Sequence, residues 1–189
     1  ARVSTLTIRT FPGTTPNRLD TLPFLSLSGL QDPTLEGWTT SSNTLASMIR
    51  GDQITLVKTP TTAGYWQGTL PTGNHEGLVT QMRVAVDSYT LGAIPYLGVF
   101  VSGTVGSRTV STILGEKAGV PSVFLVDNGS TEIASFPFDF TDGLIHTYRT
   151  IIDPVADIVV VLVDDVVVGS ATDTSFVVST PVIVCQFGI

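Results

Sequence analysis

The apolar and polar residues of this chain alternate over short distances, in a pattern that favours β-strands. The clearest segment has an apolar run over residues 158–163, two aspartates, and a second apolar run over residues 166–168 that ends at Gly169. Two apolar runs joined by two polar residues are typical of a β-hairpin. The turn residues are Asp164 and Asp165 in place of the preferred Asp-Gly, and aspartate tolerates a positive φ better than most residues. We therefore predict a hairpin that turns at Asp164-Asp165.

Other short apolar segments, separated by turn-forming residues, follow the same pattern along the chain. They predict strands at residues 3–9, 25–27, 53–58, 78–87, 96–102, 108–114, 122–126, 133–136, 145–152 and 180–187. Together with the hairpin, these strands predict an all-β fold, an antiparallel two-sheet jelly-roll sandwich. No segment has sustained helical spacing, and the nearest helical candidate is residues 44–50, with one or two turns.

Several of these strands are apolar at every position, most clearly residues 158–163, 166–168 and 181–185. A sandwich strand with one solvated face should alternate between apolar and polar residues. We therefore expect the outer face of these strands to be covered by the N-terminal segment, by loops or by another chain.

The N-terminal part is expected to form a separate arm. Residues 3–9 alternate like a short strand, and residues 11–23 contain three prolines and a glycine, which favour an extended connector. We predict an arm over residues 1–20 and a sandwich over residues 21–189, which continues beyond residue 189 if a final strand is missing. The residues expected to contact neighbouring copies are Val3, Leu6, Ile8 and Phe11.

Composition excludes several classes of partner. Of 189 residues, 42% are hydrophobic and 13% are charged, and the net charge is −7 without any cluster of Lys or Arg. A nucleic-acid binder needs a basic face, and a membrane-surface protein needs a polybasic patch, so we expect neither partner. No apolar run approaches the roughly 20 residues of a membrane-spanning helix. The single cysteine, Cys185, has apolar flanks and is expected to be a buried core residue.

The order of residues around the predicted hairpin resembles laminin-G-like and concanavalin A-like jelly-roll domains. The matching residues are Asp142, Gly143, His146, Thr147, Tyr148, Arg149, Val163, Asp164 and Asp165, the last standing where that family usually has glycine. The resemblance implies a jelly-roll fold, with His146 in a structural position next to the hairpin. It implies function only loosely, because the family includes sugar binders, glycan hydrolases, adhesion modules and virus-particle components.

Residues for catalysis are missing from the sequence pattern. A retaining glycosidase needs two carboxyl groups about 5 Å apart, and the hydrolases of this fold carry closely spaced acidic residues. None of the glutamates has a second carboxylate two or four residues downstream; they are Glu36, Glu76, Glu116 and Glu132. The two histidines, His75 and His146, have no Gly-x-Ser-x-Gly motif to work with, and they are too few for a zinc site. We expect no catalytic residues and no enzyme activity.

Calcium is the metal that the acidic turns could hold, because it prefers carboxylate and carbonyl oxygens. The candidate ligands are Asp127, Asp139 and Asp142. Each of these residues also fits a turn, in which Asp closes the backbone with its side chain. Otherwise no cofactor is expected.

Sugar binding needs exposed aromatic rings beside amide or carboxylate groups. The best cluster in the sequence is Tyr65, Trp66 and Gln67, followed by Asn74 and His75. The alternative is that Trp66 closes one end of the sandwich as a core residue.

Two functions fit these observations. The first is a structural or attachment protein of a virus particle, such as a bacteriophage decoration, fibre or tail protein, which lies on the virion surface beside copies of itself or other particle proteins. It would explain the N-terminal arm and the lack of a signal peptide and of a disulfide framework in this sequence. The alternative is a lectin-like, glycan-binding module of a secreted or cell-surface protein.

Overall fold

The computed structural model describes residues 2–11, 24–27, 39–40, 46–50, 53–57, 65–69, 77–86, 96–105, 108–127, 131–153, 156–172 and 184–188. Every regular element in these ranges is a β-strand. None of them contains a helix that is long and apolar enough to cross a membrane.

The first sheet contains eight strands, in the order β14-β13-β12-β7-β1-β5-β4, with β2 paired to β1. All described pairs are antiparallel. The strands are β1 (Arg2–Phe11), β2 (Phe24–Leu27), β4 (Ala46–Arg50), β5 (Gln53–Val57), β7 (Gly77–Ala85), β12 (His146–Asp153), β13 (Ile158–Val163) and β14 (Val166–Thr172).

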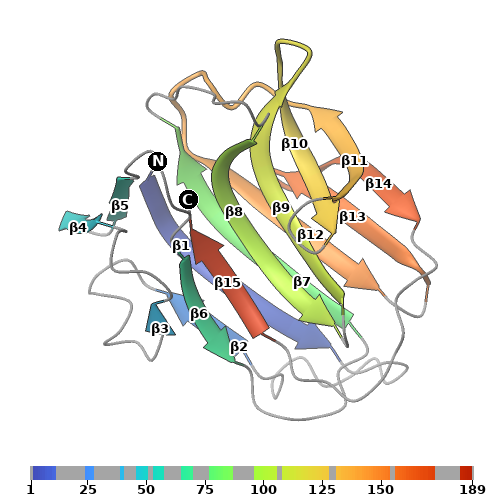
Figure 1. The fold of residues 1–189 in the computed structure, drawn as a ribbon, viewed down its shortest axis with the longest axis horizontal. Coiled ribbons are helices and arrows are strands. Elements are labelled where there is room, and N and C mark those ends of the chain that lie inside the picture. The colour runs from blue at the N-terminus through green and yellow to red at the C-terminus, as the bar shows by residue number, and fades with distance from the viewer. Residues whose placement is uncertain are drawn as a thin grey trace.

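The second sheet contains seven strands, in the order β11-β10-β9-β8-β15-β6-β3, and it is also antiparallel. The strands are β3 (Thr39–Thr40), β6 (Tyr65–Thr69), β8 (Tyr96–Val105), β9 (Arg108–Lys117), β10 (Val120–Asp127), β11 (Thr131–Pro137) and β15 (Val184–Gly188). Figure 1 shows this sheet lying over the first one. The predicted all-β fold, two antiparallel sheets in a sandwich, is confirmed.

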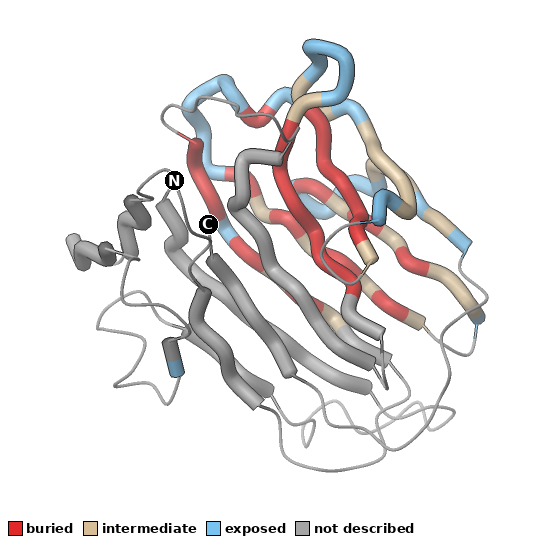
Figure 2. Tube along the Cα trace, in the orientation of Figure 1, coloured by how far each residue is buried: buried red, intermediate tan, exposed pale blue. Residues whose placement is uncertain are grey.

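The core lies between the two sheets and follows the strand period of two. Along β12, every second residue is buried, beginning with His146 and Tyr148. On β13, next to it, Val159, Val161 and Val163 are buried in the same alternation. Figure 2 shows the buried residues running along the facing strands. The Thr112 and Thr150 hydroxyls are hydrogen-bonded to each other across the interior, so that one sheet is tied to the other by buried polar groups.

The outer faces of the two sheets differ in how far they are covered. Both faces of β10 are buried from Ser122 to Val126, whereas the outward residues of β13 are only partly buried. On β14, Val166 and Val167 are 66% and 60% exposed. The expected cover over the outer face of residues 158–168 is therefore only partial within this chain.

The nearest helical candidate in the sequence is a strand in the structure. Residues 44–50 were the nearest helical candidate, but residues 46–50 form β4. This strand pairs with β5 in a register that places Ile49 opposite Ile54. Pairing with a strand of β-branched and apolar residues outweighs a weak local preference for helix. Strands β3 and β6 were not among those expected.

The β13–β14 hairpin has the predicted turn. Asp164 and Asp165 both have positive φ, at 50° and 65°, as the type I′ turn of a two-residue hairpin requires. The hairpin forms one edge of the first sheet and contacts β11, the edge of the second. At this contact the ring of Phe136 lies so close to Gly169 that a Cβ atom there would overlap it. Glycine at position 169 thus allows the two edges to meet.

Candidate functional site: a histidine between two aspartates

His146 is the most unusual buried residue in the described part of the chain. It is the first residue of β12, pairs with Val84 of β7 and is 8% exposed. The strand period turns its side chain toward the core, in line with Tyr148. A buried imidazole needs partners for its polar nitrogens, and both of them find a carboxylate.

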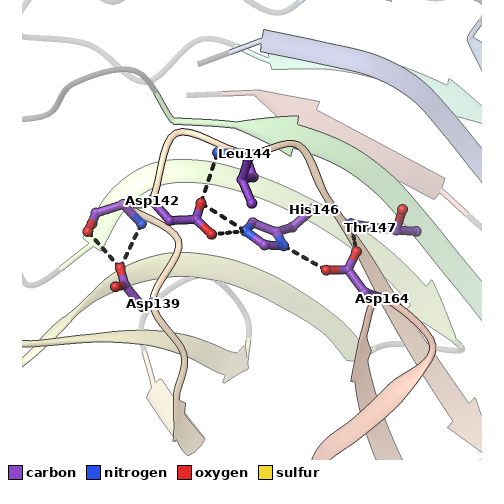
Figure 3. A network of polar contacts seen from close by, with 7 residues as sticks. Asp139, Asp142, Leu144, His146, Thr147 and Asp164 are labelled. Carbon is purple, nitrogen blue, oxygen red and sulfur yellow. Dashed lines mark hydrogen bonds and ion pairs between the residues drawn. The ribbon is translucent and has the colours of Figure 1, made fainter.

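The first carboxylate comes from the turn of the β13–β14 hairpin. His146 Nδ1 lies 2.6 Å from Asp164 Oδ2. The other oxygen of Asp164 accepts a hydrogen bond of 2.8 Å from the Thr147 amide, and the Asp164 amide donates to the Thr147 carbonyl at 2.9 Å. These three bonds fix the turn against the start of β12. Figure 3 shows the two that the Asp164 carboxylate makes.

The second carboxylate comes from the loop that precedes β12. His146 Nε2 lies 3.0 and 3.1 Å from the two oxygens of Asp142. Asp142 also accepts a 2.8 Å bond from the Leu144 amide across Gly143, whose φ is 77°. Such a side-chain bond to the backbone two residues on is an Asx turn, and the positive φ explains the glycine. The loop therefore presents Asp142 to the imidazole in a fixed position.

This geometry requires the imidazolium form of His146. An ionised carboxylate can only accept hydrogen bonds, so both ring nitrogens must donate. Burial by itself would lower the pKa of His146, but the bonds to Asp164 and Asp142 outweigh burial and raise the pKa above its usual value. The pKa of Asp142 is lowered by the Leu144 amide and by His146. Burial opposes ionisation of Asp164, yet His146 and the Thr147 amide lower its pKa.

Aromatic rings surround the imidazole on its other sides. Phe138 meets it edge-on at 4.9 Å between ring centroids, and Tyr148 lies at 6.3 Å. The Tyr148 hydroxyl is buried without a hydrogen-bond partner among the described atoms. Burial raises the pKa of Tyr148 far above its usual value, so this residue stays neutral. The ion cluster therefore lies against two uncharged aromatic side chains.

The arrangement is suited to holding two segments together and unsuited to acid–base catalysis. A general base needs a free nitrogen lone pair within reach of a substrate proton, and both nitrogens of His146 are engaged. The described geometry thus supports the structural position that the family resemblance implied for His146. The sequence pattern pointed to His146 but gave Asp164 only a place in the turn. The register of β12 and β13, which brings Asp164 beside His146, is not visible in the sequence.

The calcium candidates are not gathered into one site. Among all described residues, no three His, Cys, Asp or Glu side chains form a group that could hold a metal ion. Asp139 accepts bonds from the amide and the hydroxyl of Thr141 at 2.9 and 2.6 Å, and these bonds lower its pKa. Asp142 caps the next turn, and Asp127 ends β10 opposite Thr131. The carboxylates of Asp139 and Asp142 thus perform the turn role that was the alternative, and calcium stays a prediction.

The structure places the other candidate residues as follows. Tyr65, Trp66 and Gln67 lie in β6, between β15 and β3 in the second sheet. Asn74 and His75 are outside the described residues, so the proposed sugar-binding cluster stays a prediction. The arm residues Val3, Leu6, Ile8 and Phe11 lie in β1, which pairs with β7 on one side and with β2 and β5 on the other.

Known structures share this architecture. The chain matches the carbohydrate recognition domain of Emp46p in its potassium-bound form with a TM-score of 0.54 and 15% identity, over 86% of this chain and 88% of that domain. The chain has a concanavalin A-like jelly-roll fold. A mutant form of the same domain gives a TM-score of 0.51 at 16% identity, over 86% of this chain and 87% of that one.

A more distant match to this jelly roll is the carbohydrate binding module CBM66 from Bacillus subtilis, with a TM-score of 0.47, 17% identity, and coverage of 80% of this chain and 88% of that one. No family model and no curated protein matches the sequence. At these identities the two matches to the Emp46p domain show the jelly-roll fold and leave the site to be argued from this chain's own residues.

Proposed function

We propose that this jelly roll is a non-enzymatic glycan-binding module of a secreted or cell-surface protein. The observation that carries the proposal is its likeness to a carbohydrate recognition domain over most of both chains. A fold alone hosts many functions, so the proposal also relies on what the described residues can and cannot do.

Two observations support a binding role over hydrolysis. His146 has no free nitrogen for proton transfer. Glu132 lies 2.5 Å from the Lys117 ammonium, and this hydrogen bond lowers its pKa. A general acid in a glycosidase needs a raised pKa, so Glu132 has the wrong environment for that role. These residues behave as structural ion pairs.

The test is a glycan screen with the full chain, followed by titration calorimetry of any ligand against Trp66→Ala. The proposal expects specific binding that Trp66→Ala weakens at an unchanged melting temperature. Leu144→Ala is the control, since Leu144 is 61% exposed on a separate loop. A fall in melting temperature instead would mark Trp66 as a core residue, as in the alternative above. Absence of binding to every glycan would reject the proposal.

The second candidate is the particle-surface role, and the exposed edge strand β14 favours it. Val166–Thr172 contains no charge and no proline, the devices by which edge strands usually avoid pairing with other chains. Light scattering of the full chain and of Val167→Lys tests it: a defined oligomer that the lysine dissociates would favour assembly. Val120→Lys, at a valine that is 48% exposed in the second sheet, is the matched control.

Deletion of residues 1–18, which would remove the predicted arm, is a poor test of assembly. The deletion would remove β1, which is paired on both sides within the first sheet. Loss of an oligomer after this deletion could then reflect unfolding. A single substitution on the exposed edge separates assembly from folding.

A further inference from the structure

The outward side of the first sheet carries two arginines on neighbouring strands. On β12, burial alternates along the strand, and Thr147 and Arg149 occupy the half-buried, outward positions. On β7, Gln81 is half-buried and Arg83 is exposed, and the residue between them is buried. The register places Thr147 opposite Arg83 and Arg149 opposite Gln81. Residues at such diagonal positions lie about 7–8 Å apart, so the two arginines are neighbours on this surface although they are distant in the sequence.

Arg149 is held in a fixed orientation by two acceptors. Its Nε donates to Gln81 Oε1 at 3.0 Å, and its Nη1 lies 2.7 Å from Asp165 Oδ1. A guanidinium is planar and carries N–H donors along its whole edge, so these contacts fix its plane and use only part of its donors. Arg149 can therefore contribute to a second partner without moving.

Arg83 is an exposed cation that no described carboxylate neutralises. It pairs with Thr147 on β12 and with Thr5 on β1, and the next outward position along β7 is Gln81. None of the ion pairs among the described residues includes Arg83. The chain has 16 acidic and 9 basic residues, yet this arginine has no acidic neighbour on its own surface. It is therefore available to an anion from another molecule.

The polar groups of this surface suit an anionic sugar better than a neutral one. A neutral sugar presents hydroxyls, which need acceptors as well as donors, and the carboxylate of Asp165 already bonds to Arg149. A guanidinium matches a carboxylate instead, because its planar fork can donate two parallel hydrogen bonds. A polymer of high charge density would be repelled by the net charge of −7. A glycan with isolated carboxylates fits these conditions.

We propose that the outward side of β7 and β12 binds the carboxylate of a uronic acid in a polysaccharide, with Arg83 as the main contact and Arg149 beside it. On β13, the half-buried Leu162 lies opposite Arg149 and offers an apolar contact for the C–H face of the sugar ring. The inference rests on the proposed glycan-binding function. It adds a site on the first sheet, whereas residues 65–67 lie in the second.

The test is titration calorimetry of the full chain with oligosaccharides of galacturonic, glucuronic and mannuronic acid. Each oligosaccharide is measured beside its carboxyl-reduced, neutral form. A chelator is present so that calcium cannot join the sugar carboxylates to the acidic turns. We expect at least one acidic oligosaccharide to bind, and its neutral form to bind about tenfold more weakly or not at all.

Arg83→Gln is the decisive variant, because it removes the charge of an exposed side chain. It should weaken binding of the acidic oligosaccharide by about tenfold at an unchanged melting temperature. Arg83→Lys keeps the charge but loses the fork, so its affinity should lie between the two. Lys117→Gln is the matched control, since it changes the net charge equally but lies in β9 of the second sheet.

The outcomes separate this site from the proposed function. Equal affinity for the acidic and neutral forms, or equal losses in Arg83→Gln and Lys117→Gln, would overturn the site. Binding of neutral glycans alone would reject the site and leave the proposed function standing. Absence of binding to every glycan would reject both.

Discussion

The β9–β10 and β13–β14 hairpins close through two residues with positive φ, yet their turns are held in different ways. The first turn is Ala118-Gly119, with φ of 51° and 81°, and the structure has nothing within 4 Å of where a Gly119 side chain would begin. The second is Asp164-Asp165, with φ of 50° and 65°, and Asp164 bonds to His146 and Thr147. The first turn depends on the freedom of glycine, and the second depends on tertiary contacts.

This difference shows how one backbone conformation can serve two purposes. Alanine in the left-handed region gains nothing from its side chain and is strained by roughly 1 kcal/mol. Aspartate in the same conformation can direct a carboxylate back at the preceding strand. Asp164 therefore closes its hairpin and also supplies a carboxylate that β12 uses.

The largest expected effect is that of Asp164→Ala, which would break the second turn. It removes a charged hydrogen bond to His146 and the acceptor for the Thr147 amide, and it places alanine at positive φ. We expect a loss of about 2–4 kcal/mol in the free energy of unfolding, measured by urea denaturation. Asp164→Asn, which keeps an acceptor oxygen and tolerates the turn, should lose less than half of this. Equal losses in the two variants would assign the whole effect to the carboxylate charge, and an Asp164→Asn variant as stable as the wild type would contradict any role for that charge.

Gly169→Ala tests whether packing sets the place of the second hairpin. The new methyl group would overlap the Phe136 ring, so we expect a loss of about 1–3 kcal/mol in the same assay. The substitution should be much less harmful in a Phe136→Leu background, which leaves space for it. If the loss is the same in both backgrounds, the close contact is not its cause.

The pH dependence of stability should come from the ion cluster at the second hairpin, formed by His146, Asp142 and Asp164. The folded-state pKa of His146 is raised, so its contribution is fully present below the unfolded pKa of about 6.5 and is lost as pH rises through the folded value. Asp142 and Asp164 have lowered pKa values, so their contribution is present above about pH 4 and is lost as pH falls further. Urea midpoints should thus be highest in weakly acidic buffer. His146→Gln should remove the decline on the alkaline side; a decline that persists would assign it to another group.

The smallest expected effect concerns the first turn. Ala118→Asn replaces a residue that is strained at φ 51° with one that tolerates this region, so we expect a gain of about 0.5 kcal/mol in stability. The thermal unfolding midpoint is a sufficient measurement. Asp165→Asn at the other turn should gain nothing from the backbone, because aspartate already tolerates positive φ, and it should lose only the exposed ion pair of Asp165 with Arg149. A destabilised Ala118→Asn would mean that the turn is held by a contact of Ala118 itself.

Much of the fold followed from local sequence patterns. The alternation in residues 145–152 and the apolar run in residues 158–163 predicted β12 and β13, because burial on one face imposes a period of two. The aspartate pair predicted the turn between β13 and β14. Residues 44–50 were the exception, because a segment with weak local preference takes the conformation that its neighbouring strand β5 stabilises.

The sequence by itself determined most of the strands, the hairpin turn and the place of His146 at the start of a strand. Only the tertiary structure decided its partners. Asp164 reaches the imidazole because the antiparallel register places the hairpin turn beside the start of β12, 18 positions away in the chain, and Asp142 reaches it because the loop folds back through Gly143. Local propensities act over a few residues, whereas the charge state of a buried imidazole depends on which carboxylates the completed fold places within 3 Å or so of it.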